Sequence, residues 1–208
     1  MARLIVIRHG ETAWNRDRRV QGHTDVPLSE VGRDQAAAVA DVVEAAVPPR
    51  PTGARALLYV SDLLRARETA APIAARLRVT PRRRADLRER GMGAAEGRTF
   101  DDLAREHPEA TAAYRSHADR DALPGSEPMA AFHARVLQAV ADIATVADED
   151  ALPAVVVTHG GVLHVVLEEA LGRDKRFMIS NTALYRFDVA PPAAWGEPPR
   201  IARVTCDE

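Results

Sequence analysis

The sequence predicts an α/β fold, a three-layer α/β/α sandwich with a mainly parallel sheet. Short apolar runs rich in β-branched and aliphatic residues, typical of strands buried on both faces, occur at residues 4–7, 56–60 and 154–157. Each run is followed along the chain by a segment with helical spacing of apolar residues, and strands that alternate with helices form parallel sheets. The length of 208 residues, with 46% hydrophobic and 28% charged side chains, is sufficient for one sizeable core.

The first strand and the first long helix are separated by a polar segment. Residues 4–7 form the strand, which ends in a loop that contains a glycine. An Ala/Val-rich helix is predicted at 30–46, with Ser29 in the position of an N-cap. The proline-rich segment 47–53 ends this helix, because proline has no N–H to donate and its ring clashes with the preceding turn.

The second strand, at 56–60, leads directly into a helix. Ser61 and Asp62 are expected to open that helix, which runs to about residue 77. The following stretch, 86–97, is irregular and contains glycines, and 98–128 is polar with helical turns. A helix is predicted at 129–146, a strand at 154–157 and a further helix that ends near residue 171. Two closing strands, at 182–189 and 201–204, flank the proline-rich loop 191–199. No repeat or interdomain linker interrupts this order, which indicates a single domain over residues 1–208.

Composition argues against several classes of partner. The 28 basic and 30 acidic side chains leave a net charge of −2, so we expect no binding to nucleic acid or to an anionic membrane. Polar residues interrupt the apolar stretch 155–171, and no transmembrane helix is expected. Cys206 is the only cysteine, which excludes an intramolecular disulfide and favours a cytoplasmic protein. Lys175 is the only lysine, so nearly all the positive charge is guanidinium, which suits oxyanion recognition.

Three predicted strands end in polar or titratable side chains. The first strand ends at Arg8 and His9, the second leads to Arg65, and the third ends at His159. In open α/β sheets, ligands bind beyond the carboxyl ends of the strands. The sequence therefore predicts one site at this edge of the sheet.

The residue types at this edge favour a phosphate or another oxyanion. A lone histidine could be a nucleophile, a general base, a metal ligand or a hydrogen-bonded structural residue, but Arg8 beside His9 favours an anion over a metal. Arg8, Arg65 and a protonated His159 could donate to phosphoryl oxygens, assisted by backbone N–H groups at the helix start near Gly160. His9 would then be free to attack phosphorus, because a free imidazole with a pKa of roughly 6.5 is neutral at neutral pH.

A metal site is the competing interpretation, but the spacing of the histidines does not match a helical zinc motif. His159 and His164 are five residues apart, which is not the one-turn pair of a helical zinc motif. We therefore expect neither a metal nor another cofactor.

A longer motif runs through residues 8–15, Arg-His-Gly-Glu-Thr-Ala-Trp-Asn. Further pieces follow in the order of a known family, at Gln21-Gly22, 25–29, Gly32, Gln35-Ala36, 61–70, 87–89, 93–97, 124–127 and 158–161. Together they resemble the histidine phosphatase superfamily, phosphoglycerate mutase-like branch, over nearly the whole chain. The resemblance implies a phosphoglycerate mutase-like fold with a short helical cap inserted at about residues 90–128.

The resemblance also implies roles for individual residues. His9 is the nucleophile that becomes phosphohistidine, and Arg8, Arg65 and His159 bind the phosphoryl oxygens. Glu89 is the acid that protonates the leaving oxygen and later accepts a proton from water. The substrate-binding residues implied are Asn15, Gln21, Gly22 and Gly160.

Glu89 also has an alternative, structural interpretation. A carboxyl near several oxyanions is expected to stay protonated long enough to act as an acid. It could instead pair with the neighbouring Arg88 or Arg90.

Two departures from the family pattern lie near the expected substrate entrance. Ala95 stands where an aromatic residue is common, and 124–127 reads Pro-Gly-Ser-Glu where Pro-Gly-Gly-Glu is common. Neither affects the catalytic set, but both weaken an inference about the substrate.

The predicted function is a phosphomonoester hydrolase that acts on a small phosphorylated metabolite. The alternative is a 2,3-bisphosphoglycerate-dependent phosphoglycerate mutase, which shares every catalytic residue. Mutases carry a longer insertion than the short segment 90–126, and a fuller cap shields the phosphohistidine from water. A catalytically idle phosphate-binding protein is a third, weaker alternative.

The cap composition suggests an acidic substrate. Beyond Arg90 at its start, it contains four arginines, Arg98, Arg105, Arg115 and Arg120, and aromatic residues at 100, 114 and 132 accompany them. Such charges usually face solvent, but we expect one or two to reach inward and favour a small acidic phosphoester such as a phosphoglycerate or a sugar phosphate. An exposed apolar helix face could also support a homodimer.

Overall fold

The computed structural model of the protein describes residues 1–51, 53–172, 177–192 and 199–207. The strands are β1 (Ala2–Arg8), β2 (Leu57–Ser61), β3 (Arg82–Arg84), β4 (Ala154–Thr158), β5 (Leu184–Ala190) and β6 (Arg200–Asp207). The helices are α1 (Ala13–Arg16), α2 (Glu30–Ala46), α3 (Leu64–Leu77), α4 (Phe100–Glu106), α5 (Pro108–Arg115), α6 (Met129–Glu149) and α7 (Gly160–Leu171), with 3₁₀ turns η1 (Ala85–Leu87) and η2 (Gly93–Ala95).

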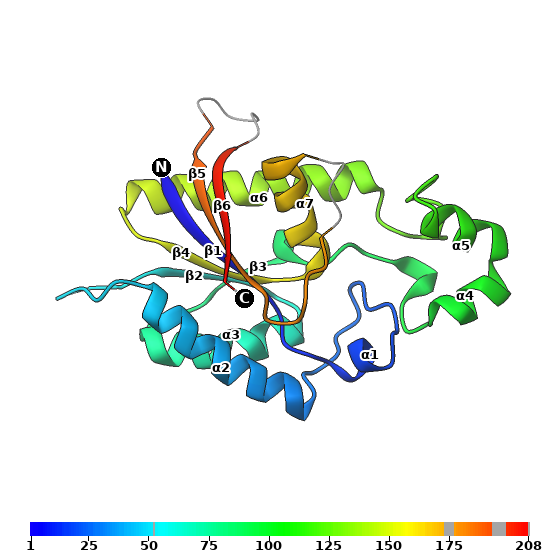
Figure 1. Cartoon of the computed structure of the whole chain (residues 1–208), viewed down its shortest axis with the longest axis horizontal. Helices are drawn as coiled ribbons and strands as arrows, with labels where there is room; N and C mark the ends of the chain where they lie inside the picture. The colour runs from blue at the N-terminus through cyan, green and yellow to red at the C-terminus, as the bar shows by residue number, and fades with distance from the viewer. Residues whose placement is uncertain (52, 173–176, 193–198, 208) are drawn as a thin grey trace.

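The strands form one sheet in the order β3-β2-β4-β1-β5-β6. Strands β3, β2, β4 and β1 are parallel to one another, whereas β5 runs antiparallel to both β1 and β6. Helices α2 and α3 cover one face and α6 and α7 the other, as Figure 1 shows. The predicted three-layer α/β/α fold with a mainly parallel sheet is confirmed.

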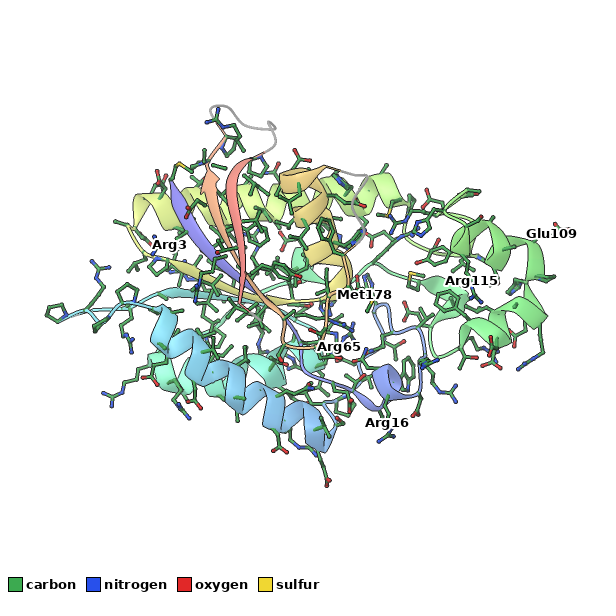
Figure 2. The ribbon with its side chains drawn as sticks, viewed as in Figure 1. Arg3, Arg16, Arg65, Glu109, Arg115 and Met178 are labelled. Carbon is green, nitrogen blue, oxygen red and sulfur yellow. The ribbon has the colours of Figure 1, made fainter. Side chains whose placement is uncertain are left out.

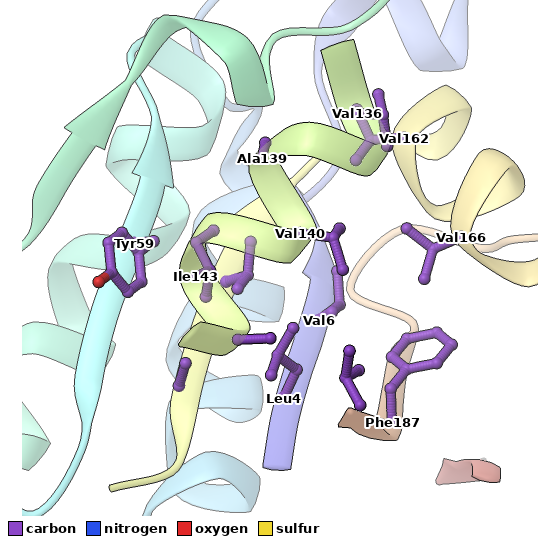
Figure 3. Packing of buried hydrophobic residues seen from close by; sticks show 14 of the residues in the cluster. Leu4, Val6, Tyr59, Val136, Ala139, Val140, Ile143, Val162, Val166 and Phe187 are labelled. Atoms are coloured by element: carbon purple, nitrogen blue, oxygen red, sulfur yellow. The ribbon is translucent and has the colours of Figure 1, made fainter. Parts of the chain in front are cut away.

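Successive side chains along the central strands point to opposite faces of the sheet, so the hydrophobic core is divided between the two faces. Leu4 and Val6 of β1 pack with α6 and α7, and Figure 3 shows Val140 of α6 over this pair. Ile5 and Ile7 point the opposite way, into the cluster formed with α2 and α3. Because both faces are buried, the strand reads as a continuous apolar run, which explains the sequence pattern.

Helices α4 and α5 project to one side of the sandwich, beyond the carboxyl ends of the parallel strands (Figure 1). Their segment has a small apolar cluster of its own, formed by Met92, Ala95, Leu103 and Leu123. Thr99 begins α4 with a capping box, and Pro108 occupies the start of α5. The polar stretch 98–128 is therefore two short helices that lie over the site.

The structure corrects the predicted start of α3. The helix begins at Leu64 rather than at Ser61-Asp62, and Leu63 precedes it without a side-chain cap. Ser61 remains in β2 because its hydroxyl bonds to His159, and Asp62 forms a bidentate pair with Arg88. Both candidate capping side chains are thus used in tertiary contacts.

Other differences lie at element ends and in short elements. The helix predicted at 129–146 continues to Glu149, and the three-arginine edge strand β3 has no apolar pattern that could have predicted it. The short helices α1, α4 and α5 were not resolved as separate elements by the sequence pattern. Lys175 and residues 193–198 of the proline-rich loop lie outside the described residues. No helix in the described ranges is long and apolar enough to cross a membrane.

Candidate functional site

The carboxyl ends of β1, β2 and β4 bring the predicted site residues together. β1 ends at Arg8, and β4, its parallel neighbour, pairs Thr158 with Arg8 in register. α3 and α7 begin at this edge, so Arg65 and Gly160, in the first turns of these helices, lie at the site. Figure 2 shows Arg65 where the strands, α3 and the loop before α1 converge.

His9 is buried, and one ring nitrogen is held by the backbone. Nδ1 lies 2.7 Å from the carbonyl oxygen of Gly10, and a carbonyl can only accept, so Nδ1 carries the proton. The main chain of His9 is also anchored, because its N–H donates to the Thr158 carbonyl at 2.9 Å. The neutral tautomer therefore leaves Nε2 with a free lone pair.

The surroundings of His9 and His159 favour their neutral forms. Burial, followed by the positive charges of Arg65 and Arg8, holds the pKa of His9 well below its ordinary value. Burial and Arg65 likewise hold the pKa of His159 well below its ordinary value. The two rings lie 5.2 Å apart. In the free site, the protonated His159 expected from the sequence is therefore disfavoured.

A neutral His159 can still donate a hydrogen bond. Its Nε2 lies 2.7 Å from the Ser61 hydroxyl, which itself accepts from the Leu63 N–H at 3.4 Å. If Ser61 donates to Nε2, the ring proton resides on Nδ1, which is buried and has no hydrogen-bond partner among the described residues. Ser61 thus orients His159, a role that the sequence pattern did not reveal, because it placed Ser61 at the start of a helix.

The two predicted phosphate-binding arginines are held by backbone carbonyls. Arg65 is 0% exposed and donates to the carbonyls of Thr24 and Gly22 at 2.9 and 2.8 Å. Burial lowers the pKa of Arg65 to about 10, so it stays charged at neutral pH. Arg8 donates to the Ile179 carbonyl. The Nε atoms of Arg8 and Arg65 are buried and have no hydrogen-bond partner within the described part of the chain.

Glu89 reaches the same site from the loop between η1 and η2. Its carboxylate accepts the Gly161 N–H at 3.0 Å and the Arg90 N–H at 2.9 Å. A side chain on Gly161 would overlap Glu89, whereas one on Gly160 would meet Arg8 only at an ordinary 3.5 Å. Gly160 lines the cavity as predicted, but Gly161 is the glycine that the close approach requires.

The side chains beside Glu89 are engaged elsewhere. Arg88 forms its bidentate pair with Asp62, and the guanidinium of Arg90 donates to Asp121 and to carbonyls of Glu127 and Arg120. The pairing of Glu89 with these guanidinium groups, considered from the sequence, is absent among the described contacts.

The loop at residues 21–24 closes the site beside Arg65. Gly22 has a φ of +53°, and a side chain there would overlap Glu96. Glu96 accepts from the Thr24 hydroxyl at 2.6 Å and from the backbone N–H groups of His23 and Thr24 at 2.9 and 2.8 Å. Burial raises the pKa of Glu96, but these bonds outweigh it and lower the pKa. Gln21 and Gly22 both line the cavity, as the resemblance implied.

Asn15 lines the cavity with its amide oxygen occupied. That oxygen accepts from the backbone and hydroxyl of Thr12 at 3.1 Å each, in a capping box at α1. The side chain of Asn181 donates to the same oxygen at 3.3 Å and to the His9 carbonyl at 3.0 Å. Asn181 lies 172 residues from His9 in the sequence, and no local pattern marked it.

A cavity of about 450 Å³ connects the strand ends to the cap. Besides the residues above, it is lined by Arg19, Val20, Met92, Phe100, Tyr114, His117, Arg120, Met129, Phe132, His164, Phe177 and Ile179. Arg120 is the one member of the four cap arginines among these described lining residues. Within the described ranges, no group of three or more His, Cys, Asp or Glu side chains could hold a metal ion.

Comparison with known proteins identifies the family and related chains. The model of the histidine phosphatase superfamily (branch 1) matches residues 4–194. The phosphoglycerate mutase-like protein 4 of Arabidopsis thaliana is 36% identical over 93% of this chain and 82% of its own length. The glucosyl-3-phosphoglycerate phosphatase of Mycobacterium tuberculosis is 35% identical over 77% of this chain and 71% of its own length. The structure of a mycobacterial glucosyl-3-phosphoglycerate phosphatase with VO3 is similar at a TM-score of 0.78, with 30% identity over 100% of this chain and 98% of that one.

Proposed function

The chain belongs to the histidine phosphatase superfamily, and from this membership and the geometry of its site we propose that it hydrolyses phosphomonoesters through a phosphohistidine at His9. One observation carries the proposal. Three buried N–H groups, on Nε of Arg8, Nε of Arg65 and a ring nitrogen of His159, have no partner among the described residues beside the nucleophilic ring. Buried donors without partners are costly, and a phosphoryl group with its several oxygens would satisfy all three.

The first step forms a bond between His9 Nε2 and phosphorus and breaks the bond from phosphorus to the ester oxygen. Nε2 supplies the electron pair, and Gly10 retains the proton on Nδ1. Glu89, in its protonated form, gives a proton to the departing alkoxide, which leaves as an alcohol. Arg8, Arg65 and His159 stabilise the charge that spreads over the equatorial oxygens in the transition state.

The second step returns the enzyme to its starting state. Glu89 accepts a proton from water, the water oxygen bonds to phosphorus, and the bond from phosphorus to Nε2 breaks. Inorganic phosphate leaves, and His9 is again neutral. In this proposal Asn15, Gln21, Gly22 and Gly160 shape the phosphate end of the cavity.

Hydrolysis is favoured over mutase activity by the short cap. The two helices α4 and α5 comprise seven and eight residues, and a small cap leaves water access to a phosphohistidine. One relative named above is a glucosyl-3-phosphoglycerate phosphatase and another is called phosphoglycerate mutase-like, so the two activities are to be separated by assay.

The test compares two activities in one purified sample. We expect wild type to release phosphate from p-nitrophenyl phosphate and His9→Ala to lose this activity. In the presence of 2,3-bisphosphoglycerate, wild type should release phosphate from 3-phosphoglycerate faster than it converts 3-phosphoglycerate to 2-phosphoglycerate. Faster interconversion than hydrolysis would identify a mutase, and equal rates for wild type and His9→Ala would exclude His9 as the nucleophile. Binding of phosphate without turnover would identify the catalytically idle protein.

We further propose that the substrate is a small phosphorylated metabolite and that residues 1–208 form one domain with residues 90–128 as its cap. A cytoplasmic location and a homodimer remain predictions from the sequence.

A further inference from the structure

The four cap arginines differ in what they contact. Arg98 pairs with Glu106 at 3.1 Å, and Arg105 pairs with Asp102. Arg115 lies over the ring of Phe100, with 5.9 Å between the guanidinium carbon and the ring centroid, and Figure 2 shows it in the cap region. These contacts lie within the cap and account for three of the four charges.

Arg120 instead lines the cavity with a weakly held guanidinium. Its side chain is 32% exposed, and its NH1 lies 3.8 Å from Oε1 of Glu168 on α7, too far for a hydrogen bond. That oxygen is 3.0 Å from Nε2 of His164, which makes the shorter contact. The Arg120 backbone is fixed, because its carbonyl accepts from Arg90 at 2.8 Å. The guanidinium is thus positioned at the cavity while its donors remain available.

The other cavity arginines are less suited to bind a second group on the substrate. Arg8 and Arg65 belong to the phosphoryl end. Arg90 is 4% exposed, and its guanidinium donors reach Glu127, Arg120, Asp121 and Ser126. Arg19 is exposed and donates to the Gly97 carbonyl at 2.8 Å. Arg120 is therefore the cap cation best placed to contact the leaving group.

The charge and polarity of the lining favour an anion at Arg120. Among the described lining residues there are five arginines and one carboxylate, Glu89, which lies at the phosphoryl end. Aromatic side chains, including Phe100, Phe132 and Phe177, form much of the rest of the lining. An ion pair is stronger beside such apolar groups than in bulk water, because the local dielectric is lower.

We propose that Arg120 binds a carboxylate on the leaving group, which makes the substrate class carboxylated phosphomonoesters. This assignment rests on the proposed phosphatase function and extends it: His9 and its neighbours bind the phosphoryl group, and Arg120 selects what it is attached to. Before substrate binds, the nearest carboxylate oxygen described for Arg120 is Oε1 of Glu168 at 3.8 Å, and a substrate carboxylate at hydrogen-bond distance would be the closer partner.

The test uses two substrates that differ at one group. 3-Phosphoglycerate carries a carboxylate where glycerol 3-phosphate carries a hydroxymethyl group. We expect wild type to prefer 3-phosphoglycerate in kcat/KM. Arg120→Met should lose about tenfold on this substrate and stay within about twofold on glycerol 3-phosphate, because only the carboxylate loses a charged hydrogen-bond donor. Arg98→Met and Arg105→Met are matched controls that remove a cap charge away from the cavity, and both should keep the preference.

The same comparison is made by binding, so that it does not depend on turnover. Calorimetry of His9→Ala with each compound should show tighter binding of 3-phosphoglycerate, and His9→Ala/Arg120→Met should abolish the difference. A preference that survives Arg120→Met, or that is lost in Arg19→Met instead, overturns the assignment. If wild type releases no phosphate from either compound or from p-nitrophenyl phosphate but the binding difference depends on Arg120, the subsite stands and the phosphatase proposal fails.

Discussion

The imidazole of His9 is buried beside two guanidinium groups, and this environment determines its charge. Burial disfavours the charged imidazolium, and the positive charges of Arg65 and Arg8 add to this effect, so the pKa of His9 lies well below its ordinary value. His159 experiences the same effect. In the proposed mechanism, this environment keeps the His9 nucleophile unprotonated, while Arg65, with a pKa of about 10, remains charged.

These shifts predict how stability depends on pH. In the unfolded chain the two histidines take up protons near pH 6.5, whereas in the folded chain they do not until the pH is much lower. The free energy of unfolding should therefore fall as the pH drops from about 6.5 to 5.5, with each histidine adding a slope that approaches about 1.4 kcal/mol per pH unit. Urea unfolding at several pH values measures this slope.

A variant comparison assigns the pH effect. His9→Ala should show a shallower slope than wild type, because one of the two histidines with a lowered pKa is removed. Identical slopes for wild type and His9→Ala would contradict the account of the His9 environment.

Adjacent glycines at the start of α7 give a second prediction. Gly161→Ala places a methyl group on the Glu89 carboxylate and 3.3 Å from Cζ of Phe132, so the acid must move. We expect kcat to fall about 100-fold, the scale of a small displacement of a catalytic group. Gly160→Ala meets Arg8 at an ordinary contact distance and should stay within a few-fold. Steady-state kinetics on p-nitrophenyl phosphate measures kcat for the two variants. An equal fall of kcat in both would contradict the special requirement for glycine at position 161.

The sequence predicts the side chains that lie at strand ends but misses those that orient them. Arg8 and His9 follow an apolar run directly, so their place at the sheet edge can be read locally. Asn181 contacts His9 from 172 residues away, and Ser61 contacts His159 from 98 residues away. Such contacts depend on the strand order β2-β4-β1-β5, which propensity and periodicity do not specify.

At the scale of elements, α6 holds the loop that carries Glu89. Arg135 on this helix donates to the carbonyls of Asp86, Arg88 and Glu89 at 2.8, 3.0 and 3.4 Å. It also forms an ion pair with Glu127 at 2.7 Å, which helps to lower the pKa of that carboxyl. A single helix residue therefore fixes a segment that has only 3₁₀ turns of its own.

Removing this anchor should affect catalysis more than substrate binding. Arg135→Met should lower stability by about 1–3 kcal/mol, because carbonyls lose their donors, and should lower kcat with KM nearly unchanged. Arg84→Met is a matched control, because the two side chains are 22% and 23% exposed and Arg84 pairs with Asp86 and Asp142 instead. Thermal unfolding and steady-state kinetics separate the two effects. An equal loss of kcat in both variants would contradict the anchoring role.

The start of α3 shows why element ends are hard to predict. Ser61 and Asp62 are residue types that commonly cap helices, and the sequence favours them as the opening pair. In the structure each makes a tertiary bond, and the helix begins two residues beyond Asp62. A cap preference of about 1 kcal/mol is outweighed when the same side chains are needed in the site.

At the scale of the whole molecule, polar contacts join the cap to the sandwich. Glu96 of the cap accepts from His23 and Thr24 in the loop at residues 21–24, and Glu127 pairs with Arg135 of α6. Within the cap, Arg90 donates to Asp121 and to the Glu127 carbonyl. The local pattern predicted the sandwich but showed the cap only as a polar stretch, because its helices are short and bury a small cluster.

These ties predict that cap and sandwich unfold together. Differential scanning calorimetry should show one transition whose calorimetric and van't Hoff enthalpies agree. Arg90→Met should move that transition to lower temperature, since it removes the donors of three hydrogen bonds, to Asp121 and to the carbonyls of Glu127 and Arg120. Two resolved transitions in wild type would show that the cap is a separate unit.

The central claim, a covalent intermediate on His9, is tested most directly by trapping it. Wild-type protein mixed with substrate is quenched within the turnover time in alkaline denaturant, which preserves phosphohistidine, and is digested for mass spectrometry. The account predicts the mass of one phosphoryl group on the peptide that contains His9, and its absence in His9→Ala. A phosphoryl group on another residue, or turnover by His9→Ala at the wild-type rate, would contradict it.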